Sequence, residues 1–199
     1  MNIPELIEAF ASCSVANIGD NLDRAIGAVG IRPFSKNSRL VGRALTVRTA
    51  PGDNLYIHRA LEELFPGCIV VVDGGGFDGR ALIGEIMAAI AKSRGAAGFV
   101  VDGAIRDAEP IATGDFPVFA RSATHLGPYK NGPGAINVPV TVGGMIVNPG
   151  DIVVGDCDGL VAFSPDIATD LLEATRKQAD KEAEMLRSVA EGTYVGAYS

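Results

Sequence analysis

The chain has 199 residues, a formal net charge of −7 and a sequence pI near 4.8. Its 17 lysines and arginines are scattered along the sequence, which disfavours nucleic-acid binding because an acidic surface repels a phosphate backbone. No uninterrupted apolar stretch approaches the roughly 18 residues that span a bilayer, and the N-terminus carries acidic residues where a secretory signal is basic, so we expect a cytoplasmic protein without membrane insertion.

The first half of the chain predicts helices at the start and then strands and helices in alternation. The expected elements are a strand at 39–49, a helix at 53–65, a strand at 67–73 and a helix at 80–94. Asp53 is a plausible N-cap for the 53–65 helix, and Pro66-Gly67 is a stop signal that ends it. These elements predict an α/β fold.

The second half is richer in strands and ends in a long helix. We expect strands at 96–102 and 117–121, several short strands between 138 and 163, and a helix from about 165 to 191. Turn residues at 148–151 and 156–159 separate the short strands. No linker or repeat divides the sequence, so it predicts a single domain over residues 1–199.

A glycine-rich stretch raises the question of a nucleotide site. Gly74, Gly76 and Gly79 are spaced as G-x-G-x-x-G between a predicted strand and a predicted helix, and Asp102 follows 23 residues after Gly79. That fingerprint normally opens its domain and precedes further βαβ units, which this chain lacks, so we expect no nucleotide cofactor. A second interpretation is an anion site, in which amides at the start of the 80s helix hold a carboxylate and Gly84 permits close approach.

Three charged residues follow the predicted parallel strands. Arg106 and Asp107 come just after the 96–102 strand, and Glu85 lies near the start of the preceding helix. If the two strands are adjacent and parallel, these side chains converge on a crevice where α/β proteins bind ligands. The alternative is an ordinary ion pair that ties two loops together.

Glu85, followed after twenty residues by Arg106-Asp107, resembles the acid-x20-Arg-Asp signature of the class II pyruvate aldolases. These enzymes cleave 4-hydroxy-4-methyl-2-oxoglutarate and 4-carboxy-4-hydroxy-2-oxoadipate, and they share a family with the regulator of ribonuclease activity A, the RraA-like family. The resemblance runs in order through SVANIGDNLDR (14–24), VGRALTVRTAPGDN (41–54), VVVDGGGFDGRALIGE (70–85), GFVVDGAIRD (98–107), FPVFAR (116–121) and INVPVTVGGMIVNPGDIVVGDCDGLV (136–161). It covers roughly residues 12 to 165.

The resemblance implies a three-layer α/β/β domain of the swivelling type, assembled as a homotrimer or hexamer with active sites at subunit interfaces. It implies that Asp107 ligates a divalent Mg²⁺ or Mn²⁺ directly, that Glu85 acts on the metal through a bound water, and that Arg106 contacts the pyruvyl oxygen. Many of the aldolases carry Asp where this chain has Glu85. The backbone amides implied to hold the substrate carboxylate are those around Gly84, Glu85, Ile86 and Met87.

The activity implied by the resemblance is retro-aldol cleavage of a 4-hydroxy-2-oxo acid to pyruvate, with oxaloacetate decarboxylation as a second activity. Both reactions leave a pyruvate enolate, whose negative charge needs a Lewis acid and a fixed cation. The alternative from another class is a non-catalytic regulator that binds and inhibits a ribonuclease. The presence of Glu85 together with Arg106-Asp107 favours the enzyme, because a binding protein has no need of a metal site. A nucleotide-dependent reaction such as methyl transfer is a third, less favoured interpretation.

Several further residues are weaker candidates. His125 is the better of the two histidines for substrate choice, while His58 is either a general base or structural. The candidates for binding a second substrate carboxylate are Arg24, Arg80 and Lys130, those for completing a neighbouring site are Glu182 and Glu184, and the cysteines expected to be reduced and mostly buried are Cys13, Cys68 and Cys157.

Overall fold

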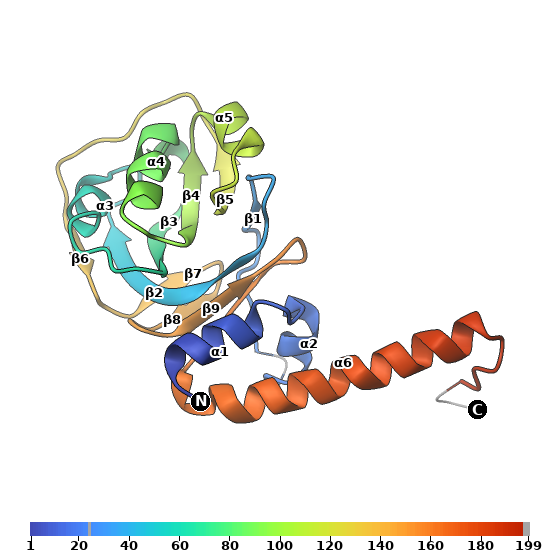
Figure 1. The fold of residues 1–199 in the computed structure, drawn as a ribbon. Coiled ribbons are helices and arrows are strands. Elements are labelled where there is room, and N and C mark those ends of the chain that lie inside the picture. Colours follow the sequence, from blue (N-terminus) through green and yellow to red (C-terminus); the bar gives the residue numbers. More distant parts are fainter. Residues whose placement is uncertain (24, 197–199) are drawn as a thin grey trace.

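The computed structural model describes residues 1–23 and 25–196. A central sheet lies between a layer of helices and a small second sheet, as Figure 1 shows. The helices are α1 (Ile3–Phe10), α2 (Val15–Asp20), α3 (Leu55–Ala60), α4 (Glu85–Ser93), α5 (Ala108–Thr113) and α6 (Ala168–Ala190), with a 3-10 turn at Pro165–Ile167. The strands are β1 (Arg32–Pro33), β2 (Leu40–Thr49), β3 (Cys68–Ile83), β4 (Gly98–Ile105), β5 (Val118–Ala123), β6 (Gly134–Ile136), β7 (Val140–Val142), β8 (Met145–Val147), β9 (Ile152–Gly155) and β10 (Leu160–Phe163).

The central sheet has the order β1-β5-β4-β3-β2-β9-β10, with β6 added beside β2. Strands β2, β3, β4 and β5 are parallel, whereas β9 and β10 continue the sheet in antiparallel fashion. The parallel strands are buried on both faces, which explains why their sequences are continuous β-branched runs rather than alternating ones. The carboxyl ends of β3 and β4 therefore meet at the same edge of the sheet.

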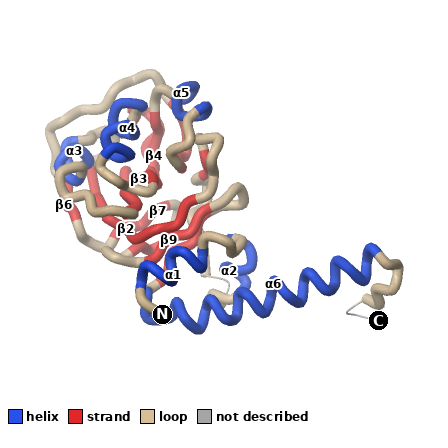
Figure 2. Tube along the Cα trace, in the orientation of Figure 1, coloured by secondary structure: helices blue, strands red, loops and turns tan. Residues whose placement is uncertain are grey.

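Each face of the sheet has its own apolar core. Helices α3, α4 and α5 cover one face, where Ile57, Met87 and Ile111 pack against strand residues such as Phe99. The β7–β8 hairpin covers the opposite face and buries Val142 among others. Helices α1, α2 and α6 pack near β9 and β10, and Figure 2 shows these three helices grouped apart from α3, α4 and α5. This arrangement confirms the α/β/β fold with a C-terminal helix.

Most of the expected strands are confirmed. β2, β4 and β5 match the predictions at 39–49, 96–102 and 117–121, with β4 running three residues further, to Ile105. The strand-rich segment forms β7 to β10, and its turns lie at the predicted positions between β8 and β9 and between β9 and β10. Helix α6 with its preceding 3-10 turn matches the helix predicted from about 165 to 191.

The prediction for the glycine-rich stretch is wrong in one respect. Residues 80–83 belong to β3 rather than to a helix, and α4 starts only at Glu85. Between Asp73 and Ile83 the strand departs from regular pairing with β4, and Gly75 and Gly76 have φ of +68° and +67°, a conformation that favours glycine. The glycine run at 74–76 therefore lies in a bulge inside β3. The G-x-G-x-x-G stretch does not form the strand-to-helix turn of a dinucleotide fingerprint.

The helix predicted at 53–65 is shorter than expected. α3 covers only Leu55–Ala60, and Asn54 rather than Asp53 is the N-cap residue. The Asp53 side chain nevertheless accepts a hydrogen bond from the Leu55 amide at 2.9 Å, so it still satisfies the first turn of the helix. Residues after Ala60 continue as hydrogen-bonded turns.

The three cysteines are free thiols, and Cys13 and Cys68 are buried while Cys157 is exposed, which agrees with the expectation of reduced and mostly buried cysteines. Burial raises the pKa of both buried thiols and keeps them protonated. Among the described residues, no helix combines the length and the apolar character needed to cross a membrane.

Candidate active site

Arg106 and Asp107 leave the carboxyl end of β4, directly beside the carboxyl end of β3. Asp107 has φ 57° and ψ 43°, the left-handed conformation, and it is the N-cap residue of α5. A side-chain-bearing residue pays a conformational cost there, and such residues cluster at functional sites. The backbone turn places both side chains at the edge of the sheet.

Arg106, Asp107 and the backbone at the start of α4 lie together, whereas the Glu85 side chain, which was expected to converge with them, does not line the same cavity. The Asp107 Oδ2 atom lies 3.8 Å from the Arg106 Nε atom and accepts a hydrogen bond from the Glu85 amide at 3.1 Å. The ion pair is long and both side chains are partly exposed, so it contributes little by itself to stability. The Asp107 carboxylate thus remains available to other ligands.

Gly84 is required by close packing at this point. A Cβ atom at residue 84 would clash with Asp107 Oδ2 and lie 3.0 Å from the Arg106 Cγ atom. Without a side chain, Gly84 also cannot cap α4, so the amides of Ile86 and Met87 in the first turn lack an acceptor from the N-cap residue. This helix start is suited to hold an anionic group.

Substitution of Gly84 with alanine should therefore damage the site more than the fold. Its φ of −148° is accessible to alanine, so backbone strain is not the issue, whereas the new methyl group must displace Asp107 and Arg106. We expect the rate of any reaction at this site to fall about 10²-fold, as for a catalytic group misplaced by about 1 Å, with a small change in melting temperature. Steady-state kinetics and thermal unfolding would check this, and an unaltered rate would contradict it. The control is Gly19→Ala, because a Cβ at Gly19 meets no atom within 4 Å.

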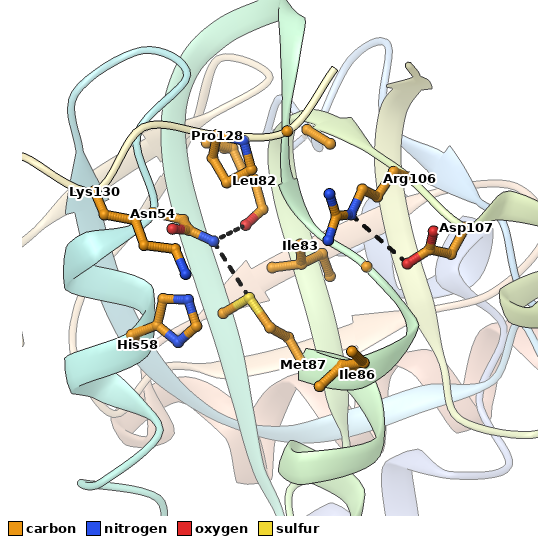
Figure 3. A pocket seen from close by; sticks show the side chains of 13 residues that line it. Asn54, His58, Leu82, Ile83, Ile86, Met87, Arg106, Asp107, Pro128 and Lys130 are labelled. Atoms are coloured by element: carbon orange, nitrogen blue, oxygen red, sulfur yellow. Dashed lines mark hydrogen bonds and ion pairs between the residues drawn. The ribbon is translucent and has the colours of Figure 1, made fainter. Parts of the chain in front are cut away.

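A cavity of about 310 Å³ opens beside these residues, and Figure 3 shows its walls. Arg106 and Asp107 lie on one side, and Asn54, His58 and Lys130 lie together on the other side. The remaining lining residues are Ala81, Leu82, Ile83, Gly84, Ile86, Met87, Gly127 and Pro128. The cavity thus has Lys130 at one end and the Arg106 guanidinium with the Asp107 carboxylate at the other, with an apolar floor between them.

Asn54 is a polar residue of this wall that the sequence reasoning missed. It is 3% exposed, and its Nδ2 atom donates to the Leu82 carbonyl at 3.0 Å and to the Met87 sulfur at 3.4 Å. Its Oδ1 atom is buried and has no hydrogen-bond partner among the described residues. Leaving such an acceptor unsatisfied is costly, which is typical of residues retained for function. The sequence signal that could have found it is an amide side chain at the end of the short connection between β2 and α3.

The histidine in this wall has a perturbed titration. Burial, and after it the positive charge of Lys130, lower the pKa of His58. The unfolded state therefore binds a proton to His58 more readily than the folded state does. The stability that neutral His58 contributes is fully present above about pH 6.5, and it is lost as the pH falls towards the lower pKa of the folded state.

We accordingly expect the free energy of unfolding to decrease between about pH 7 and pH 5, and to decrease less in His58→Gln. Denaturant unfolding at a series of pH values would measure both slopes. His125→Gln is the control, since His125 lies outside this cavity. Equal slopes for the wild type and His58→Gln would contradict the assignment.

The other candidates fall in different places. His125 lines an adjoining cavity of about 440 Å³ that also contacts Arg106 and Asp107. The Arg80 guanidinium is engaged by the Gly127 carbonyl at 2.7 Å and the Tyr129 hydroxyl at 2.9 Å, and Arg80 does not line the main cavity. Arg24 lies outside the described residues. Of the two described cations among these candidates, Lys130 lines the main cavity and Arg80 does not.

Glu85 contributes its amide to the site, whereas its side chain is exposed and does not line the main cavity. Asp107 offers a hard carboxylate oxygen at the cavity edge, a donor that fits Mg²⁺ or Mn²⁺ with several retained waters. A separate group, Asp156, Cys157 and Asp158, brings three possible metal-ligand atoms together elsewhere. Asp156 already accepts from the Val15 amide and pairs with Arg39. Glu182 accepts hydrogen bonds from Asn17 and Gln178 on the same chain.

Comparison with known proteins identifies relatives over most of the chain. The RraA-like family model, described as Aldolase/RraA, matches residues 15–162. A protein of Halalkalibacterium halodurans with the provisional name 4-hydroxy-4-methyl-2-oxoglutarate aldolase is 40% identical over 181 residues, covering 90% of this chain and 86% of the relative. The structure of the RNA-processing inhibitor RraA from Thermus thermophilus matches with a TM-score of 0.70 and 33% identity, over 76% of this chain and 93% of that one. An uncharacterized protein from Pseudomonas syringae shares the fold, with a TM-score of 0.88 at 24% identity over 97% of this chain and 92% of that one.

Proposed function

The chain belongs to the RraA-like (Aldolase/RraA) family, and we propose that it is a divalent-metal-dependent lyase that cleaves a 4-hydroxy-2-oxo acid to pyruvate. The observation that carries the proposal is the meeting of Arg106, Asp107 and the uncapped start of α4 at one cavity. These groups supply a cation, a carboxylate and free amides within reach of one small anion. A protein that only binds a partner has no need of this combination.

Each part of the site has a role in the proposed reaction. The amides of Ile86 and Met87, with Gly84 allowing approach, hold the carboxylate of the 2-oxo acid. The C4 hydroxyl loses its proton to solvent and becomes the carbonyl of the released aldehyde or ketone as the C3–C4 bond breaks. The electron pair of that bond forms the C2=C3 bond of an enolate with its charge on the C2 oxygen, and protonation of C3 completes pyruvate. The Arg106 guanidinium, which lines the cavity, is proposed to stabilise the charge on the enolate oxygen, and its planar fork can contact two oxygens.

Asp107 is the proposed direct ligand of Mg²⁺ or Mn²⁺, and Glu85 is proposed to act through a bound water. When bound, the ion would supply Lewis acidity to the 2-oxo group. Loss of carbon dioxide from oxaloacetate also leaves a pyruvate enolate, so we propose oxaloacetate decarboxylation as a second activity of the same residues. Lys130, at the far wall, is the proposed contact of a second substrate carboxylate.

We further propose that the chain folds as one domain, because a single sheet connects all three core clusters. Assembly into a homotrimer or hexamer is also proposed. It is supported by Ile86, which is 71% exposed at the edge of the cavity and would be covered by a neighbouring subunit.

The second candidate function is a regulator that binds and inhibits a ribonuclease, and it is favoured by the likeness to the Thermus RraA structure. The two functions are separated by assaying pyruvate release from 4-hydroxy-4-methyl-2-oxoglutarate and from oxaloacetate, with Mg²⁺ and with EDTA. We expect turnover that EDTA abolishes and added Mn²⁺ restores. Equal rates with and without metal would refute the proposed mechanism, and ribonuclease inhibition without any turnover would favour the regulator.

A further inference from the structure

His58 and Lys130 lie on the same wall of the cavity, but they come from distant parts of the sequence. His58 lies on α3, and Lys130 lies in the segment that connects β5 with β6. Both side chains project into the same cavity, as Figure 3 shows. Some contact must therefore hold the 124–133 segment in place against the start of α3.

Asp53 makes that contact with both carboxylate oxygens. Its Oδ1 atom accepts from the amide of Leu55, the first residue of α3, at 2.9 Å. Its Oδ2 atom accepts from the amides of Asn131 and Gly132 at 2.6 Å and 3.1 Å, immediately after Lys130. One buried side chain, 3% exposed, thus joins the helix that carries His58 to the segment that carries Lys130.

Backbone hydrogen bonds on the other side of Lys130 complete the attachment. The Tyr129 amide donates to the Gly52 carbonyl at 2.8 Å, and the Asn54 amide donates to the Tyr129 carbonyl at 3.0 Å. Residues 52–54 therefore hold both chain neighbours of Lys130, Tyr129 and Asn131, by hydrogen bonds. Arg80 also holds this segment, through Gly127 and Tyr129, but it makes no contact with α3 in the described structure.

The chemistry of this position calls for a carboxylate. Burial by itself would raise the pKa of Asp53, but the hydrogen bonds from Asn131, Leu55 and Gly132 together lower it, so the group is ionised. An asparagine offers one acceptor oxygen and one NH₂ group in the same space. If its oxygen accepts from the Leu55 amide, its NH₂ group faces the amides of Asn131 and Gly132, which are also donors.

We propose that Asp53 is a positioning residue that keeps His58 and Lys130 next to each other on one wall of the cavity, and so fixes the distance between Lys130 and Arg106, the cations proposed to hold the two ends of the bound substrate. The effect on turnover rests on the proposed lyase function, whereas the geometry can be tested without it. Asp53 does not line the cavity, so it acts through its neighbours and not on the substrate.

The test is the titration of His58, followed by NMR in the full-length protein. The chain has two histidines, so His58 and His125 are readily distinguished, and His125 serves as an internal reference. In Asp53→Asn we expect the His58 pKa to rise towards its ordinary value, because Lys130 moves away and the wall becomes more solvated. Loss of the Asp53 charge alone would lower that pKa, so a rise reports the change in geometry. Lys130→Met gives the value expected when the lysine charge is absent.

The matched control is Asp151→Asn. Asp151 is also a buried aspartate that accepts from backbone and side-chain amides, in the turn between β8 and β9 away from the cavity. Its substitution should leave the His58 pKa unchanged. An unchanged His58 pKa in folded Asp53→Asn would overturn the proposal. If Asp53→Asn does not fold, Asp53→Glu, which keeps both oxygens on a longer arm, must raise the His58 pKa where Asp151→Glu does not.

Kinetics then connect the geometry to turnover. We expect Asp53→Asn to raise KM for a dicarboxylic 4-hydroxy-2-oxo acid about tenfold while kcat changes less than about threefold, because the groups at Arg106 stay in place. Asp151→Asn should change neither constant. A fall in kcat at unchanged KM would contradict the positioning role. If the wild type releases no pyruvate, the proposed function fails. The His58 titration still decides whether Asp53 positions His58 and Lys130.

Discussion

Asp107→Ala is expected to reduce pyruvate release by at least 10²–10³-fold, the effect of removing one preorganised group that stabilises developing charge. The reason is that the Asp107 carboxylate is the charged oxygen ligand that the structure places beside Arg106 and the start of α4. The same change should weaken Mn²⁺ binding, because the ion loses its proposed direct ligand. Steady-state kinetics with Mg²⁺ and titration of Mn²⁺ followed by electron paramagnetic resonance would measure the two effects.

The control for this variant is Asp115→Ala. Asp115 is an exposed carboxylate paired with Lys92 on the surface, so it tests the loss of one negative charge away from the cavity. Asp107→Ala should remain folded, because Asp107 is partly exposed and its ion pair is long. Undiminished turnover in folded Asp107→Ala would remove the basis of the proposed mechanism.

The second large effect is expected from Arg106→Lys, which keeps the positive charge but removes the planar fork. We expect kcat to fall about 10²–10³-fold, equivalent to about 2.7–4 kcal/mol of transition-state stabilisation, with a smaller change in KM. The fall should be similar for 4-hydroxy-4-methyl-2-oxoglutarate and oxaloacetate, because both leave the same enolate. Rates measured with both substrates at saturating Mg²⁺ would test this.

Arg94→Lys is the matched control for Arg106→Lys. Like Arg106, Arg94 pairs with a carboxylate, that of Glu62; it also donates to the Leu61 carbonyl, and it lies away from the cavity. A loss in Arg106→Lys for only one of the two substrates would show that Arg106 selects the substrate and does not stabilise the shared enolate.

The sequence predicts those parts of the site whose positions depend on residues that are neighbours in the chain. Arg106 and Asp107 directly follow a run of buried β-branched residues, and strands with such runs are central and parallel. Gly84 and Glu85 start the helix after the preceding strand, so the two loops meet at one edge. The bulge at Gly75 and Gly76 was not foreseen, because a run of glycines is compatible with both a bulge and a turn.

The wall of the cavity opposite Arg106 and Asp107 could not be predicted from neighbouring residues. Lys130 was only one of three possible cations, and nothing in the local sequence separates it from Arg80, whose guanidinium is held by Gly127 and Tyr129. The choice depends on the path of the 124–133 segment across the sheet. That path is fixed by hydrogen bonds to residues 52–54, about 75 positions earlier in the chain.

The sequence alone determined the family, the parallel strands and the Arg106-Asp107 pair, because each depends on neighbouring residues or on a motif of fixed spacing. Only the tertiary structure decided that Asn54, His58 and Lys130 share one wall and that Asp53 joins them. Those contacts are between segments far apart in the chain, and their formation depends on how the sheet brings its connections together in space.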